Sequence, residues 1–231
     1  MATSRERTRA ADAQGLSERS PAKHLTGGGT SGNERLTTAV GATLIVLLAV
    51  IGLTLLRLHG RLLSVHLFVG MLLVPPVLLK LASTGYRFIR YYTGNPRYRE
   101  HGPPELPLRV LAPMVVLSTF VVFVSGVVLL FVGPSARSTW FPIHKVSFFV
   151  WLAFMGVHVL GHLPSMPAVL RADYGRHSSG GYESLGGNVT GRTGRVLALS
   201  GALVAGVVLA ILVIPQFGPW LHDAGLFHPD R

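Results

Sequence analysis

Five long apolar stretches organise the sequence, and the segments between them are polar and rich in Arg, Gly and Pro. Each stretch has roughly 18–23 mainly apolar residues, and a helix needs about 20 to cross the hydrocarbon core of a bilayer. The pattern therefore predicts an all-α fold, a polytopic transmembrane helix bundle of about five spans. The predicted spans cover residues 36–56, 62–83, 110–132, 142–163 and 196–214.

The polar segments divide the chain into three regions. Residues 1–33 are rich in Arg, Ser, Thr and Gly without an apolar run, which predicts a disordered basic cytoplasmic tail rather than a signal peptide. Residues 34–214 form the predicted bundle, and residues 215–231 a short C-terminal tail. Lys and Arg are concentrated in the first region and in segments 86–109 and 164–195, as in cytoplasmic loops. We therefore predict a multi-pass protein of the cell (plasma) membrane with a cytoplasmic N-terminus and an external C-terminus.

Composition supports membrane insertion and excludes several classes of protein. Hydrophobic residues make up 49% of the chain and charged residues only 13%, which is too apolar for an ordinary soluble domain. The net charge is +11, but the basic residues flank the apolar stretches instead of forming one face. We therefore expect contact with the lipid bilayer and no binding of nucleic acid. The chain has no cysteine, which excludes thiolate-bound iron–sulfur clusters and covalently attached haem.

Acidic residues are absent from the predicted spans. All ten Asp and Glu fall in the predicted tails or loops, whereas proton-coupled transporters normally carry a carboxylate inside the membrane. The sequence also lacks a glycine-rich phosphate loop and a grouped nucleophile, base and orienting residue. We therefore expect no nucleotide, flavin or hydrolytic site.

Histidines inside two predicted spans are the candidate chemistry. At about 3.6 residues per turn, His144, His158 and His162 fall on nearly one face of the fourth span, and His66 lies near the start of the second. The helical rise places His158 roughly 21 Å from His144, towards the other side of a core about 30 Å thick. Imidazole inside a membrane usually faces the bundle interior, and it is a common axial ligand of haem iron.

The outer pair of histidines suits one cofactor. The second and fourth spans run in the same direction, so His66 and His144 are predicted at similar depth near the outer leaflet. This arrangement favours a haem b held between the two imidazoles. Gly70, one turn from His66, would leave room for a flat macrocycle. The alternative is that both imidazoles bond water or lipid headgroups at the membrane interface.

The inner pair, His158 and His162, leaves several alternatives open. The residue fourteen positions after His66 is Lys80 and not a second histidine, so a symmetric second haem lacks a ligand unless Met114 supplies it. A quinone site is another alternative, and a packed polar pair without a ligand is a third. A shared zinc ion is disfavoured because no carboxylate lies nearby in the sequence to complete the site.

The chain resembles bacterial membrane-anchored b-type cytochromes, including the cytochrome b subunits of respiratory hydrogenases and formate dehydrogenases. The residues that carry the resemblance are His66 and Gly70 in the second span and His144, His158 and His162 in the fourth. It covers roughly residues 36–163, and segment 66–86 is also similar to a group of small actinobacterial membrane proteins. The resemblance implies a four-helix core of the haem-binding type, with His66 and His144 as ligands of the haem iron.

The function that this resemblance implies is electron transport in a respiratory chain. We expect an integral membrane b-type cytochrome that transfers electrons between a partner oxidoreductase subunit and the quinone pool. Such a chain is an electron-transfer subunit more than a stand-alone enzyme, because the chemistry belongs to its cofactor. The alternative is a membrane scaffold or assembly protein without a cofactor.

Overall fold

The protein is a bundle of long helices. The computed structural model describes residues 29–55, 61–99, 106–164, 166–174 and 191–223. These described residues contain helices and no strand, and five of the helices are long and apolar enough to cross a membrane. The five are α2 (Gly29–Thr54), α3 (Arg61–Tyr92), α5 (Leu106–Val132), α6 (Arg137–His162) and α8 (Arg192–Leu212). The predicted all-α polytopic bundle is therefore confirmed, and the chain is a multi-pass membrane protein.

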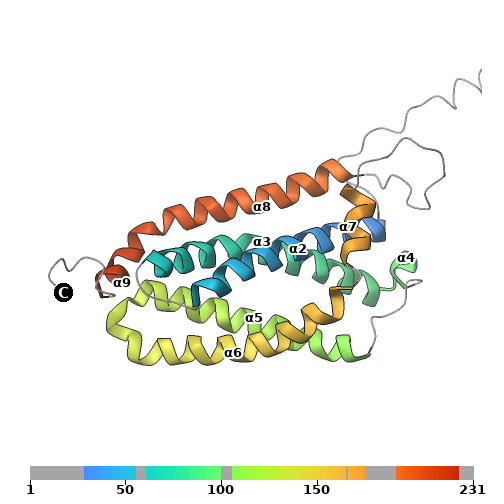
Figure 1. The fold of residues 1–231 in the computed structure, drawn as a ribbon. Helices are drawn as coiled ribbons and strands as arrows, with labels where there is room; N and C mark the ends of the chain where they lie inside the picture. The colour runs from blue at the N-terminus through green and yellow to red at the C-terminus, as the bar shows by residue number, and fades with distance from the viewer. Residues whose placement is uncertain (1–28, 56–60, 100–105, 165, 175–190, 224–231) are drawn as a thin grey trace, which may run out of the picture.

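Successive spans alternate in direction, so the bundle has two distinct ends (Figure 1). One end, here the α9 end, carries the short helices η2 (Pro134–Ala136), η3 (Ile214–Phe217) and α9 (Gly218–Asp223). The other, here the α7 end, carries α4 (Pro96–Arg99) and α7 (Met166–Tyr174).

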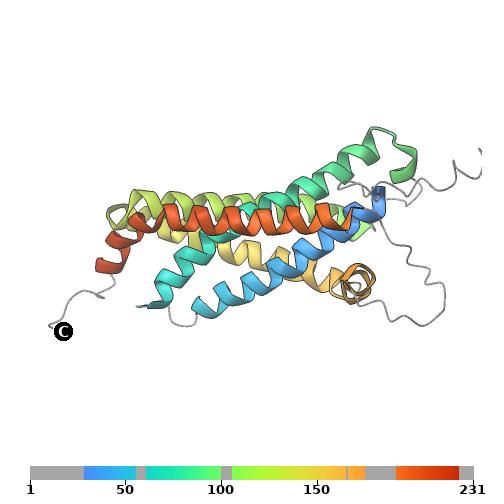
Figure 2. The same ribbon diagram turned by 90° about the horizontal axis from the view of Figure 1, so that it is seen from above.

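The five long helices pack as two groups. Helix α3 packs against both α2 and α8, while α5 and α6 pair as a hairpin that touches α3 mainly through α5. Seen from above, α3 passes beneath α8 with α2 beside it (Figure 2). The approach of α3 to α8 requires glycine, because a Cβ atom at Gly206 would overlap the carbonyl oxygen of Leu72.

The helices extend past the predicted spans because the chain has no stop signal there. Helix α3 continues beyond residue 83 and ends at Tyr92. It is capped by Gly94, whose φ of 82° is the left-handed conformation that glycine adopts without penalty. The amide of Gly94 bonds the carbonyl of Tyr91, and that of Asn95 bonds the carbonyl of Arg90, which is a Schellman cap. Helix α2 likewise starts at Gly29.

The boundaries of the two predicted tails shift accordingly. Residues 29–33 belong to α2, and the rest of the predicted N-terminal tail lies outside the described residues. Glu34, which the sequence placed just outside the first span, therefore lies inside a helix. Residues 214–223 of the C-terminal region form η3 and α9, and residues 224–231 lie outside the described part.

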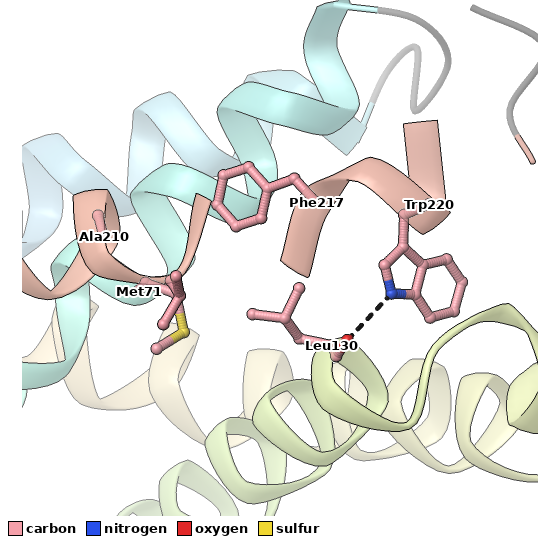
Figure 3. Close-up of a cluster of buried hydrophobic side chains, with 6 residues drawn as sticks. Met71, Leu130, Ala210, Phe217 and Trp220 are labelled. Carbon is pink, nitrogen blue, oxygen red and sulfur yellow. Dashed lines mark hydrogen bonds between the residues drawn. The ribbon is translucent and has the colours of Figure 1, made fainter. Parts of the chain in front are cut away.

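A cluster of buried side chains fixes the C-terminal segment to the α9 end (Figure 3). Its members are Met71, Leu130, Ala210, Val213, Phe217 and Trp220. The indole nitrogen of Trp220 donates a hydrogen bond to the carbonyl of Leu130 at 3.2 Å. That carbonyl belongs to the last turn of α5, where the helix itself supplies no donor. The segment after α8 is thus a packed cap over α3 and α5.

Candidate functional site

His66 is held by a hydroxyl from the end of the preceding helix. It lies half-buried near the start of α3, and its Nδ1 is 2.9 Å from the hydroxyl oxygen of Thr54, the last residue of α2. The Thr54 hydroxyl donates its single proton to the carbonyl of Ile51. An imidazole with its proton on Nδ1 would donate to this oxygen and keep a lone pair on Nε2.

His144 is held in the same manner by the neighbouring helix of the α5–α6 hairpin. Its Nδ1 lies 3.1 Å from the hydroxyl of Ser125, which donates to the carbonyl of Val122, also at 3.1 Å. The Val122 carbonyl lies beside the imidazole as well. With the Ser125 proton on that carbonyl, an imidazole protonated on Nδ1 would donate to the Ser125 oxygen and again keep a lone pair on Nε2.

Two further features fix the His144 ring. The hydroxyl of Ser147, one turn along α6, donates to the carbonyl of His144 at 2.9 Å and lies 3.2 Å from the Ser125 hydroxyl. A Cβ atom at Gly126 would lie 2.9 Å from Cε1 of His144, so only glycine lets the ring rest against the backbone of α5. The orientation of the ring is therefore set by packing as well as by hydrogen bonds.

The structure brings His66 and His144 to the same end of the bundle. Both lie in the turns of their helices next to the α9 end, and they are close enough to influence one another electrostatically. They belong to α3 and α6, which do not form a packed helix pair among the described elements. At Gly70, one turn further along α3, a Cβ atom would meet only the side chain of Ile51, at 3.8 Å. A side chain at Gly70 would therefore make ordinary van der Waals contact with α2.

The inner histidines occupy the opposite end. The rings of His158 and His162 lie edge to face with centroids 4.7 Å apart near the end of α6. His158 is half-buried and His162 is exposed. Lys80 of α3 is within electrostatic range of both rings. The structure therefore groups His158 and His162 with Lys80, and places them away from His66 and His144.

Two predicted partners for the inner histidines gain no support from their surroundings. Met114 is 41% exposed and lines an apolar groove of about 560 Å³ along the α5–α6 seam, whose lining includes neither His158 nor His162. Among the described residues no group of three or more His, Asp or Glu is placed to hold a metal ion, so the described part of the chain adds no third ligand for zinc.

The outer histidines have the donor chemistry that axial haem ligation needs. In each, Nδ1 lies against a hydroxyl that can accept a proton held there, which is how metal-bound histidines are usually oriented. Two protein ligands suffice for a haem iron, because the porphyrin supplies the other four. Sequence reasoning missed Thr54, Ser125 and Ser147, which lie against these rings, and assigned Gly126 no role at the site.

We compared the chain with protein families, curated proteins and solved structures, and no match was found.

Proposed function

We propose that this chain is an integral membrane b-type cytochrome that holds one haem b between His66 and His144. The observation that carries the proposal is the shared environment of the two imidazoles. In each, Nδ1 lies within hydrogen-bond distance of a hydroxyl that also contacts a helix carbonyl, an arrangement that suits a proton on Nδ1 and a lone pair on Nε2. Interfacial histidines that bond only water or headgroups would not need a buried hydroxyl on each ring.

The side chains around the site have separate roles in this proposal. Thr54 and Ser125 set the tautomer and the ring orientation of the two ligands, and they raise the basicity of each imidazole. Gly126 lets the ring of His144 rest against α5. A bound haem would supply a one-electron iron couple, while the apolar helices exclude water from it.

We further propose a direction and partners for the electron. The basic side chains Arg87, Arg90 and Arg99 lie at or near the α7 end, so that end faces the cytoplasm in our proposal and the α9 end faces outside. A haem at His66 and His144 would then lie towards the outer leaflet. A partner oxidoreductase subunit and the quinone pool are the proposed donor and acceptor, which makes the chain an electron-transfer subunit.

The proposal is tested by the colour of the purified protein. Wild-type protein, produced with adequate haem supply and purified in detergent, is expected to show a b-type α-band in a dithionite-reduced minus oxidised visible spectrum. The haem content per chain, measured as the pyridine haemochrome, is expected to approach one. If folded wild-type protein shows no band under these conditions, the cytochrome proposal fails and a cofactor-free scaffold becomes the function to pursue.

A further inference from the structure

A lysine is built into the α7 end of the bundle, between α2 and α3. Lys80 is half-buried, and its ammonium donates a hydrogen bond to the main-chain carbonyl of Thr37 at 2.7 Å. The ammonium lies close to Gly41, where a Cβ atom would be 3.1 Å from the Lys80 nitrogen and so tightly packed against it. The ammonium is therefore positioned by the fold and does not hang loosely from the helix surface.

The polar contacts around Lys80 fix the two helices to each other. The hydroxyl of Ser83 donates to the carbonyl of Lys80, and Thr37 donates to the Ser83 hydroxyl, both at 3.0 Å. The side-chain amide of Asn33 donates to the carbonyl of Ser83, also at 3.0 Å. Helices α2 and α3 thus hold the lysine in one place.

Three more basic groups lie within electrostatic range of this ammonium. His158 and His162 of α6 lie within electrostatic range of Lys80, as does Arg87 two turns further along α3. Lys80 and His158 are half-buried, while Arg87 and His162 are exposed. We call these four residues, Lys80, Arg87, His158 and His162, the basic cluster. It includes half-buried and exposed side chains near the α7 end.

The positive charge of Lys80 is not neutralised by the described part of the chain. No carboxylate in that part forms an ion pair with Lys80, including Glu34, which lies one turn before Thr37 on α2. Only one of the three ammonium protons has a protein acceptor in the described part. A charge inside a membrane is costly unless it is paired or meets an opposite charge.

We infer that the basic cluster binds the phosphate headgroup of an anionic membrane lipid. Phosphate oxygens can accept the remaining ammonium protons, and basic pockets between transmembrane helices on one membrane side bind such headgroups. Val157 and Leu160, on the same stretch of α6, are 59% and 70% exposed and offer an apolar surface to acyl chains. A quinone, the earlier alternative for the inner histidines, is neutral and would leave the Lys80 charge uncompensated.

The test is a lipid titration of delipidated, detergent-purified full-length protein followed by native mass spectrometry. The probes are phosphatidylglycerol, phosphatidylcholine with the same acyl chains, and inorganic phosphate. The first phosphatidylglycerol is expected to bind tighter than the first phosphatidylcholine, and Lys80→Gln is expected to reduce this preference by roughly five- to tenfold. Lys80→Arg keeps the charge and is expected to retain most of the preference.

The control is Lys145→Gln, which removes an exposed lysine of α6 near the α9 end and should leave the preference unchanged. A fall in the preference for phosphatidylglycerol as salt is raised would support a charge contact. Competition by millimolar inorganic phosphate would support a phosphate site at the basic cluster whose ligand is a soluble anion and not a lipid. Equal binding of the two lipids, or a preference that Lys80→Gln leaves intact, would overturn the inference. Neither His66 nor His144 takes part, so the outcome is independent of haem binding.

Discussion

The His66→Ala and His144→Ala variants are each expected to lose the haem absorbance of the wild-type protein almost completely. Each substitution removes one of the two imidazoles that lie at the α9 end with Nε2 lone pairs. Loss of an outer-sphere partner of a metal ligand costs about 10–100-fold in affinity, so loss of the ligand itself should cost roughly 100-fold or more. The haem content per chain and the reduced minus oxidised spectrum measure the effect.

Two controls separate loss of a ligand from loss of the fold. His222→Ala removes an exposed histidine of α9 at the same end of the bundle and should leave the haem content at the wild-type value. The thermal unfolding of each variant in detergent, followed without reference to haem, should resemble that of haem-free wild-type protein. Folded His66→Ala and His144→Ala proteins that both keep a full α-band would show that these histidines are not the ligands.

The second large effect is expected from the two hydroxyls that orient the ligands. Thr54→Val keeps the shape of the side chain but removes the acceptor of the His66 Nδ1 proton, and Ser125→Ala does the same for His144. The haem affinity should fall by about 10–100-fold in each variant. The midpoint potential of the haem that remains should rise. A less basic imidazole favours ferric iron less strongly than the hydrogen-bonded imidazole of the wild type does.

Thr54→Ser is the matched control, since it keeps the hydroxyl and removes only a methyl group. Haem titration of the apoprotein should place it near wild type and well above Thr54→Val. A purely structural role for Thr54 would destabilise the protein without moving the potential. If Thr54→Val and Thr54→Ser bind haem equally well at the same potential, the hydroxyl does not position a ligand.

The sequence predicts that His66 and His144 lie at the same end of the bundle. It does not predict which residues contact their rings. Alternation of spans is enough to make α3 and α6 parallel, and the distance of each histidine from its span end then sets its depth. Which face of α5 meets α6 is a different matter. Helix α5 is apolar almost all round, so periodicity does not indicate its rotation about its own axis. Ser125 and Gly126 could therefore not be assigned to His144 beforehand.

At the α7 end, too, the sequence pattern predicts one feature of Lys80 while its contacts depend on helix packing. Fourteen residues are close to four helical turns, so Lys80 was expected on the face of α3 that carries His66. The contact of its ammonium with the carbonyl of Thr37 depends on how closely α2 approaches, which Gly41 permits. The sequence indicates Lys80 as the position where a second histidine is missing, whereas its contacts place it in the basic cluster.

Helix ends were the least predictable feature of the fold, for a physical reason. An apolar window finds the part of a helix that lies in hydrocarbon, but a helix continues as long as its backbone has partners. Helix α3 therefore runs past the apolar part to the cap at Gly94. The C-terminal region was likewise read as a tail, although the hydrogen bond from Trp220 to Leu130 packs it onto α5.

Low-temperature electron paramagnetic resonance of the oxidised, haem-loaded wild-type protein tests the central claim most directly. The signal reports the axial ligands of the iron without any substitution in the chain. Two histidine ligands predict a low-spin ferric signal as the main species, with an intensity that approaches one iron per chain. A high-spin signal as the main species, or no ferric haem signal from folded protein, would contradict ligation by His66 and His144.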